Sequence, residues 1–297
     1  MRLVKRTASP ISNMRPTDLI QALAVVVIWG LNFVVIKTAV GEIPPLALTA
    51  LRFFAVAMLV APFFRPSRDQ FKRILGIAAV MGPGHFGLLF IGLDGADAAT
   101  AALMIQLGVP FSSILAALVF SDRLGMVQGL GMVMAFTGAA LLAGEPQGGT
   151  PLALGALLVS AFCCAWANIL IKKAPDIPPM TIIGWMSLLS IPVVAGMSAV
   201  FETGQQQAIQ SASMKTWGAL AYIVLASSIV AYYLWYRLIA RLSVNKVVPF
   251  TLLAPTIGVA AGVLILGEAL TLYKVTGGIL TLAGVAIIQM RRARYLD

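Results

Sequence analysis

Long apolar runs separated by short polar segments dominate this chain. A membrane-spanning helix needs about 20 mostly apolar residues, whereas the strands of a membrane barrel are about half as long and alternate with a period of two. The pattern therefore predicts an all-α integral membrane protein. The ten predicted spans are Leu19–Lys37, Pro45–Phe64, Ile74–Leu93, Ala98–Phe120, Met126–Ala143, Leu152–Ile171, Met180–Phe201, Trp217–Arg237, Lys246–Leu266 and Leu272–Met290.

The basic residues between these spans predict an orientation, because cytoplasmic loops are enriched in Lys and Arg. With the N-terminus inside, 17 of the 21 basic residues are cytoplasmic, Lys37, Lys215 and Lys274 are external, and Arg52 lies within the second span. We expect both termini in the cytoplasm of a cell with a bacterial-type inner (plasma) membrane. The inside residues are Arg2, Lys5, Arg6, Arg15, Arg65, Arg68, Lys72, Arg73, Arg123, Lys172, Lys173, Arg237, Arg241, Lys246, Arg291, Arg292 and Arg294.

Composition excludes a soluble protein. Of the 297 residues, 60% are hydrophobic and 11% are charged, and the mean hydropathy is +0.94. A soluble domain is about one-quarter charged. The net charge of +10 follows from the cytoplasmic loops, so it indicates contact with anionic lipids and no nucleic acid as a partner.

The two halves of the chain repeat one pattern. Asn32-x4-Lys37 precedes one Pro-Pro pair and Asn168-x4-Lys173 precedes another. Each predicted half, 1–147 and 148–297, holds five spans, and an odd number inverts the second half in the membrane. Glycine spacings on the fifth and tenth spans favour close helix contact, as a scaffold or in a homodimer. Residues paired at an offset of 146 are Asp122 and Glu268, Leu124 and Leu270, Gly131 and Gly277, and Gly138 and Gly284.

These motifs resemble the drug/metabolite transporter superfamily, and specifically its ten-helix EamA-like branch. The quoted matches are Trp29-Gly30-Leu31-Asn32-Phe33 with Lys37, Pro44-Pro45, Ala50-Leu51-Arg52-Phe53, Asp122-Arg123-Leu124 and Glu268-Ala269-Leu270. The resemblance covers nearly the whole chain and is closest to the exporters of aromatic and other amino acids. It implies a transporter that exports amino acids and related small metabolites. We further expect substrates with aromatic or methionine-like side chains, and a monomer or homodimer. Arg52 departs from the two-fold pattern, since its aligned position falls near Trp185-Met186.

Three prolines predict hinges within the spans. Pro83 lies in Gly82-Pro83-Gly84-His85 on the third span, and Pro110 and Pro255 lie on the matching fourth and ninth spans. Proline removes a backbone donor, and broken helices in corresponding positions indicate a midplane site in a transporter. The alternative is that these prolines only kink helices for packing.

A central cavity is predicted from polar and aromatic side chains away from the span ends. Paired mid-span tryptophans offer flat walls and faces for an ammonium, and methionine offers adaptable apolar surface. The alternatives are helix–helix hydrogen bonds for the polar residues and lipid contact for the indoles. The predicted lining is Trp29, Asn32, Met81, His85, Gln106, Trp166, Asn168 and Ser228.

No Asp or Glu falls in the middle of a predicted span, which favours uniport or facilitated transport by alternating access over proton coupling. His85 is the one candidate proton carrier, unless it is a neutral, hydrogen-bonded residue. The alternative function is a proton-coupled drug/metabolite or nucleotide-sugar transporter, although the latter would need a basic cluster. Cys163 and Cys164 lack metal spacing and are expected to pack in a helix. We expect no enzyme activity, cofactor or metal.

Overall fold

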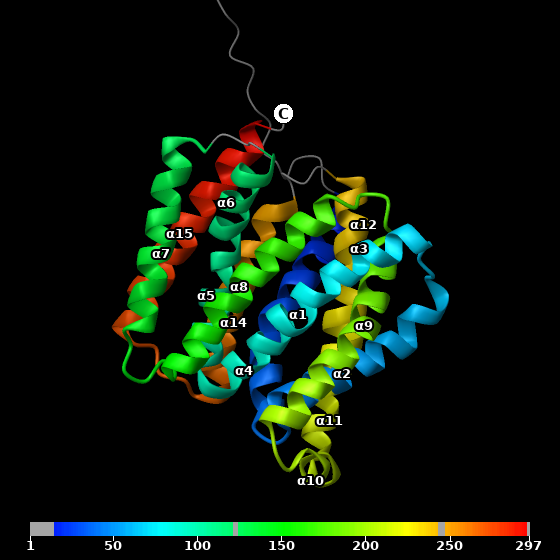
Figure 1. Ribbon diagram of the computed structural model, residues 1–297. Helices are drawn as coiled ribbons and strands as arrows, with labels where there is room; N and C mark the ends of the chain where they lie inside the picture. Colours follow the sequence, from blue (N-terminus) through cyan, green and yellow to red (C-terminus); the bar gives the residue numbers. More distant parts are fainter. Residues whose placement is uncertain (1–14, 121–123, 243–246, 296–297) are drawn as a thin grey trace, which may run out of the picture.

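The computed structural model describes residues 15–120, 124–242 and 247–295, which fold almost entirely into helices (Figure 1). The first half holds α1 (Pro16–Val40), α2 (Pro45–Val60), η1 (Ala61–Phe63), α3 (Arg68–Ala79), η2 (Val80–Gly87), α4 (Leu88–Gly95), α5 (Ala98–Met104), η3 (Ile105–Leu107), α6 (Gly108–Phe120) and α7 (Met126–Ala143). The second half holds α8 (Pro151–Lys172), α9 (Pro179–Phe201), α10 (Gln205–Ser211), α11 (Met214–Ala221), η4 (Tyr222–Val230), α12 (Ala231–Arg241), η5 (Val248–Leu252), α14 (Leu253–Leu266) and α15 (Leu272–Tyr295).

The predicted ten-span helical membrane fold is confirmed. Within the described residues, nine helical segments are long and apolar enough to cross a bilayer, and a tenth, Phe250–Leu266, is apolar but shorter. The third span begins earlier than the hydropathy indicated, at Arg68. A capping box explains the extension: the Ser67 hydroxyl accepts from the Gln70 N–H at 3.3 Å, and the Gln70 side chain accepts from the Ser67 N–H at 3.0 Å.

The inverted repeat is visible where α7 and α15 pack in opposite directions (Figure 1). A Cβ on Gly277 would lie 2.7 Å from the Gly138 carbonyl oxygen, and a Cβ on Gly131 would lie 2.8 Å from the Gly284 carbonyl oxygen. Gly131 and Gly277 correspond in the repeat, as do Gly138 and Gly284, so the two contacts are the same contact made once from each half. A two-fold axis in the membrane plane produces this arrangement. These glycines therefore serve a close helix contact within the chain.

Helical geometry changes in corresponding spans of the two halves. In the third and eighth spans, η2 and η4 are π-helical, and in the fourth and ninth spans η3 and η5 are 3₁₀ helices. Pro83 lies inside η2, while Pro110 and Pro255 follow η3 and η5 by less than a turn. No proline lies in η4, so the sequence did not predict its change of geometry. There the Ser228 hydroxyl donates to the Ile223 carbonyl at 2.6 Å and satisfies one carbonyl of the widened turn.

We call the end of the bundle at which α1 begins and α15 ends the upper end, as drawn in Figure 1, and the other the lower end. The helices α2, α8 and α11 begin at the lower end, and α3 and α9 begin at the upper end. Several predicted positions lie outside the described residues. They are Arg2, Lys5, Arg6, Asp122, Arg123 and Lys246.

Candidate functional site

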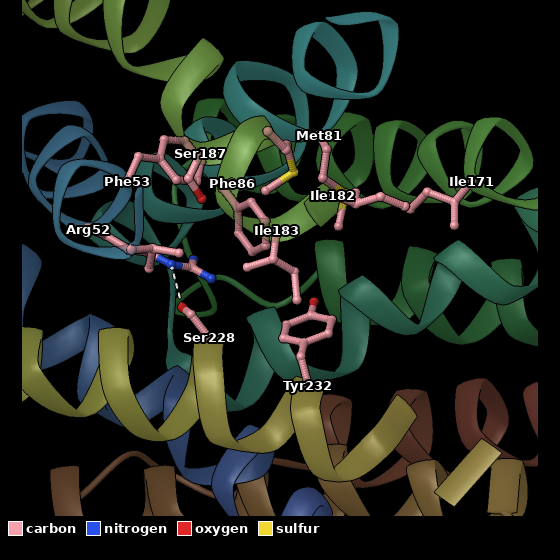
Figure 2. A pocket seen from close by; sticks show the side chains of 12 residues that line it. Arg52, Phe53, Met81, Phe86, Ile171, Ile182, Ile183, Ser187, Ser228 and Tyr232 are labelled. Atoms are coloured by element: carbon pink, nitrogen blue, oxygen red, sulfur yellow. Dashed lines mark hydrogen bonds between the residues drawn. The ribbon is translucent and has the colours of Figure 1, made fainter. Parts of the chain in front are cut away.

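A cavity lies between the two halves, where α2 and η2 face α9, η4 and α12 (Figure 2). Its volume is about 30 Å³, which is enough for water and too small for a metabolite. Ile171 in the last turn of α8 and Ile182 in the first turn of α9 bound it toward the upper end. The lining residues are Arg52, Phe53, Val56, Met81, Phe86, Ile171, Ile182, Ile183, Met186, Ser187, Ser228 and Tyr232.

Arg52 is the charged residue among those that line the cavity. It lies halfway along α2 and is only 3% exposed. Its Nε donates to the Ser228 hydroxyl at 3.1 Å, a contact drawn as a dashed line in Figure 2. Its Cζ lies 3.9 Å from the ring centroid of Phe86 and 5.8 Å from that of the fully buried Phe90. The guanidinium is therefore held against aromatic faces at mid-depth.

Of the residues predicted to line the cavity, Met81 and Ser228 do so. Trp29 is not among the lining residues but packs on Tyr232, which is. Its ring centroid lies 5.2 Å from that of Tyr232 and 5.4 Å from that of Trp235. Its indole N–H donates to the Ser227 carbonyl at 3.4 Å. The structure thus places Trp29 against a lining residue rather than in the lining.

His85 lies between η2 and α8 and is buried. Its Nδ1 is 2.9 Å from the hydroxyl and 3.2 Å from the carbonyl oxygen of Ser160. The Ser160 hydroxyl proton is already directed to the His85 carbonyl at 2.8 Å, so Nδ1 is the donor toward Ser160. This geometry fixes the orientation of the imidazole ring and links the third span to the sixth.

The other predicted residues lie outside the cavity lining. Trp166, on α8, packs against the cluster of Leu115, Ala116, Ala165 and Ile169 that joins α6 and α8. Asn168 is exposed, and its amide donates to the Cys164 sulfur at 3.9 Å. Asn32 is partly buried and its Oδ1 has no hydrogen-bond partner, while Gln106 is partly buried on η3. The structure does not bring these four side chains together around the cavity.

Two carboxylates join the halves at the lower end. Glu202, after α9, accepts from the N–H groups of Leu46 and Ala47 at 2.6 and 3.0 Å. Glu268, after α14, accepts from the first two N–H groups of α5 at 2.7 and 3.0 Å. A carboxylate at a helix N-terminus satisfies open donors and complements the helix dipole. Each contact fixes the end of a second-half helix to the start of a first-half helix.

Sequence reasoning missed Arg52 as a lining residue because it lacks a basic counterpart near Trp185-Met186. In the structure Met186 lines the same cavity, so the two-fold axis relates an arginine to a methionine across one space. The signal that identifies Arg52 is simpler: it is the basic residue in the middle of a span. Phe86, Ile183 and Tyr232 carry no comparable signal.

The two inverted five-helix halves with a cavity between them define a membrane transporter and not an enzyme. The model of the EamA-like transporter family matches residues 17–144 and 151–290, so the chain belongs to that family.

Two relatives in sequence agree with this assignment, and a solved structure shares the fold. A protein of Salmonella typhimurium, named as a probable amino-acid metabolite efflux pump, is 33% identical over 90% of this chain and 92% of its own length. A protein of Escherichia coli with the same name is 33% identical over 92% and 95%. A solved crystal structure with 18% identity covers 96% of this chain and 100% of its own, with a TM-score of 0.65, and shares the fold.

Proposed function

We propose that this protein exports amino acids and related small metabolites through the cavity between its halves. The observation that carries the proposal is a mid-depth space lined by both halves, apolar apart from Arg52, Ser187, Ser228 and Tyr232. The efflux pumps named among the relatives support amino-acid metabolites as the substrate class.

Alternating access is the proposed mechanism. Glu202 and Glu268 bind the halves together at the lower end, while the cavity extends from Arg52 toward the upper ends of α8 and α9. The distribution of 17 basic residues against 3 supports a cytoplasmic location of the upper end. A substrate would then enter from the cytoplasm when the upper end opens, and leave when the lower contacts break.

Transport is proposed to be uniport. No carboxylate is among the described residues that line the cavity, and Nδ1 of His85 is directed to Ser160. A proton-driven exporter usually carries a titrating carboxylate within the membrane. Downhill flux of a neutral amino acid therefore requires no proton.

The test uses purified protein in proteoliposomes. Radiolabelled leucine, methionine and phenylalanine should equilibrate across the membrane without a pH gradient, and protein-free liposomes should not take them up. Ser187→Phe fills the cavity and should abolish uptake, while Gly196→Phe, which adds the same ring on α9 where nothing lies within 4 Å, should not. Uptake only with an imposed pH gradient would support the proton-coupled alternative. Uptake of nucleotide sugars instead would overturn the amino-acid assignment.

A further inference from the structure

Arg52 is a buried cation with unused hydrogen-bonding capacity. Its Nη1 is buried and has no hydrogen-bond partner. Arginine remains protonated in proteins, and its guanidinium presents five donors. The bond from Nε to Ser228 uses one of them. Inside a membrane protein, an unsatisfied charge of this kind marks a functional site.

The orientation of the guanidinium is fixed from two sides. The Ser228 hydroxyl gives its own proton to the Ile223 carbonyl at 2.6 Å, so its lone pair is what accepts from Arg52. The Phe86 ring lies against the guanidinium, with 3.9 Å between Cζ and the centroid. A planar guanidinium stacked on a ring retains the donors at its edge. The bond to Ser228 and the ring of Phe86 thus leave the Nη1 donors for a ligand.

The surroundings supply no anion. Tyr232 points into the cavity from α12 in Figure 2, and the described residues of the lining include neither Asp nor Glu. Desolvating a cation is costly unless an anion compensates it. A ligand carboxylate meets this need, because arginine binds carboxylates through parallel N–H donors. Much of the remaining lining is apolar, with Met81, Ile183 and Met186 among the side chains that would contact the rest of the ligand.

We propose that Arg52 anchors the substrate carboxylate, and that this site takes monocarboxylates with an apolar side chain whose α-amino group is dispensable. The inference rests on the proposed function and names the recognised group. Ser228 is the positioning residue for Arg52, and the methionines adapt to different side chains. The cavity must widen before such a ligand enters, since its volume is about 30 Å³.

Competition in proteoliposomes tests which group is recognised. The probe is uptake of radiolabelled L-leucine, challenged with 4-methylpentanoate, which lacks the amine, and with L-leucinamide, which lacks the carboxylate. We expect 4-methylpentanoate to compete within about threefold of L-leucine and the amide to be weaker by about tenfold or more, as a lost charged contact predicts. Equal competition by the amide, or none by 4-methylpentanoate, would overturn the proposal.

Substitutions of Arg52 distinguish a role in binding the substrate carboxylate from a purely structural role. Arg52→Lys keeps the charge but loses the fork, and Arg52→Met removes both. Each should raise the KM for leucine by about tenfold or more, whereas Arg68→Met, which removes an exposed arginine on α3, should not. Ser228→Ala should raise KM by a smaller factor with little change in the maximal rate.

Thermal unfolding provides a readout that is independent of transport. Removing an unpaired buried charge should leave the melting temperature of ligand-free Arg52→Met equal to or above that of the wild type. A clear decrease would assign Arg52 to the fold and overturn the proposal. 4-Methylpentanoate should raise the melting temperature of the wild type but not of Arg52→Met. If this shift occurs and leucine is not transported, the carboxylate anchor stands and the amino-acid assignment fails.

Discussion

Glu42 and Asp176 make equivalent contacts at opposite ends of the molecule. Each precedes an Ile-Pro-Pro sequence in the first loop of its half. At the lower end, Glu42 accepts from the N–H and hydroxyl of Ser213 at 2.7 and 2.8 Å. At the upper end, Asp176 accepts from Arg73 at 2.6 Å through both carboxylate oxygens. Each carboxylate thus joins a loop of one half to the N-terminal part of the third span of the other, at the N-cap of α11 and in the second turn of α3.

Both carboxylates remain charged across the physiological range. Hydrogen bonds from Arg73 lower the pKa of Asp176 to about 2, and hydrogen bonds from Ser213 lower the pKa of Glu42. A carboxyl whose pKa is lower in the folded than in the unfolded state stabilises the fold at pH values above its unfolded-state pKa. That stabilisation is lost as the pH falls through the folded-state pKa. For Asp176 that window runs from its ordinary pKa of 3.8 down to about 2, so titration of this group near neutral pH does not open the upper end.

Removal of either contact should favour opening at its own end. In a variant lacking Cys163 and Cys164, Ser187→Cys reports access to the cavity through labelling by a membrane-impermeant thiol reagent. Glu42→Ala should speed labelling from the lower face and Asp176→Ala from the upper face, each by less than about fivefold because exposed pairs contribute little. Arg68→Ala, a change at an exposed residue of α3, should alter neither rate. An increase from the same face in both variants would contradict the paired arrangement.

The predicted orientation can be measured with the caps of the two equivalent helices. Ser67 caps α3 at the upper end and Ser213 caps α11 at the lower end. Single cysteines at these positions, without Cys163 and Cys164, should be labelled from opposite sides of intact cells, Ser67→Cys from the cytoplasm. Loss of a serine cap costs about 1 kcal/mol, which leaves the fold intact. Labelling of both from one side would refute the inverted orientation.

His85 is expected to act in the fold and not as a proton carrier. His85→Gln retains a donor toward Ser160 and removes only the titratable ring. It should therefore transport leucine without a pH gradient within about twofold of the wild type. His85→Leu should lower stability by about 1–3 kcal/mol, because the buried carbonyl of Ser160 loses a donor. Denaturant or thermal unfolding in detergent measures the second effect. A His85→Gln protein that folds normally and does not transport would contradict this assignment.

Alanine substitutions of the two mid-span tryptophans are expected to differ in their effects on transport and stability. Trp29 packs on Tyr232, so Trp29→Ala should weaken transport about two- to tenfold, which corresponds to an aromatic contact of roughly 0.5–1.5 kcal/mol. Trp166 packs against the cluster that joins α6 and α8, so Trp166→Ala should lower the melting temperature more than it changes KM. Transport kinetics and surface expression of both variants check this. Normal transport by a well-expressed Trp29→Ala protein would remove the indole from the site.

The glycine contact between α7 and α15 predicts a position-specific stability effect. In Gly138→Ala the new Cβ would lie 2.5 Å from the Gly277 carbonyl oxygen, which should destabilise the protein by about 1–3 kcal/mol. Gly129→Ala on the same helix meets nothing within 4 Å and should stabilise by about 0.5–1 kcal/mol. Thermal unfolding of the two variants in the same detergent provides the comparison. Equal behaviour of both would disprove the close approach.

The sequence predicted the fold closely and the site only in part. Proline and glycine signals indicated the altered helical geometry near Pro83, Pro110 and Pro255, but none indicated η4. In the structure Met81 and Ser228 line the cavity, whereas His85 contacts Ser160 on α8 and Trp166 packs against the cluster that joins α6 and α8. Polar residues within spans serve both purposes, and their spacing does not distinguish substrate contact from a bond between helices.

The sequence by itself determined the number of spans, their inversion and the capacity of the two glycine-rich helices for close contact. This information lies in hydropathy, loop charge and internal repetition, because a bilayer requires long apolar helices with satisfied backbone groups. Only the tertiary structure decided which faces meet. In a membrane the lipid-facing and protein-facing sides of a helix are both apolar, so the pattern does not encode rotation about the helix axis. Arg52 meets Ser228 and Phe86 because packing turned three helices toward one space.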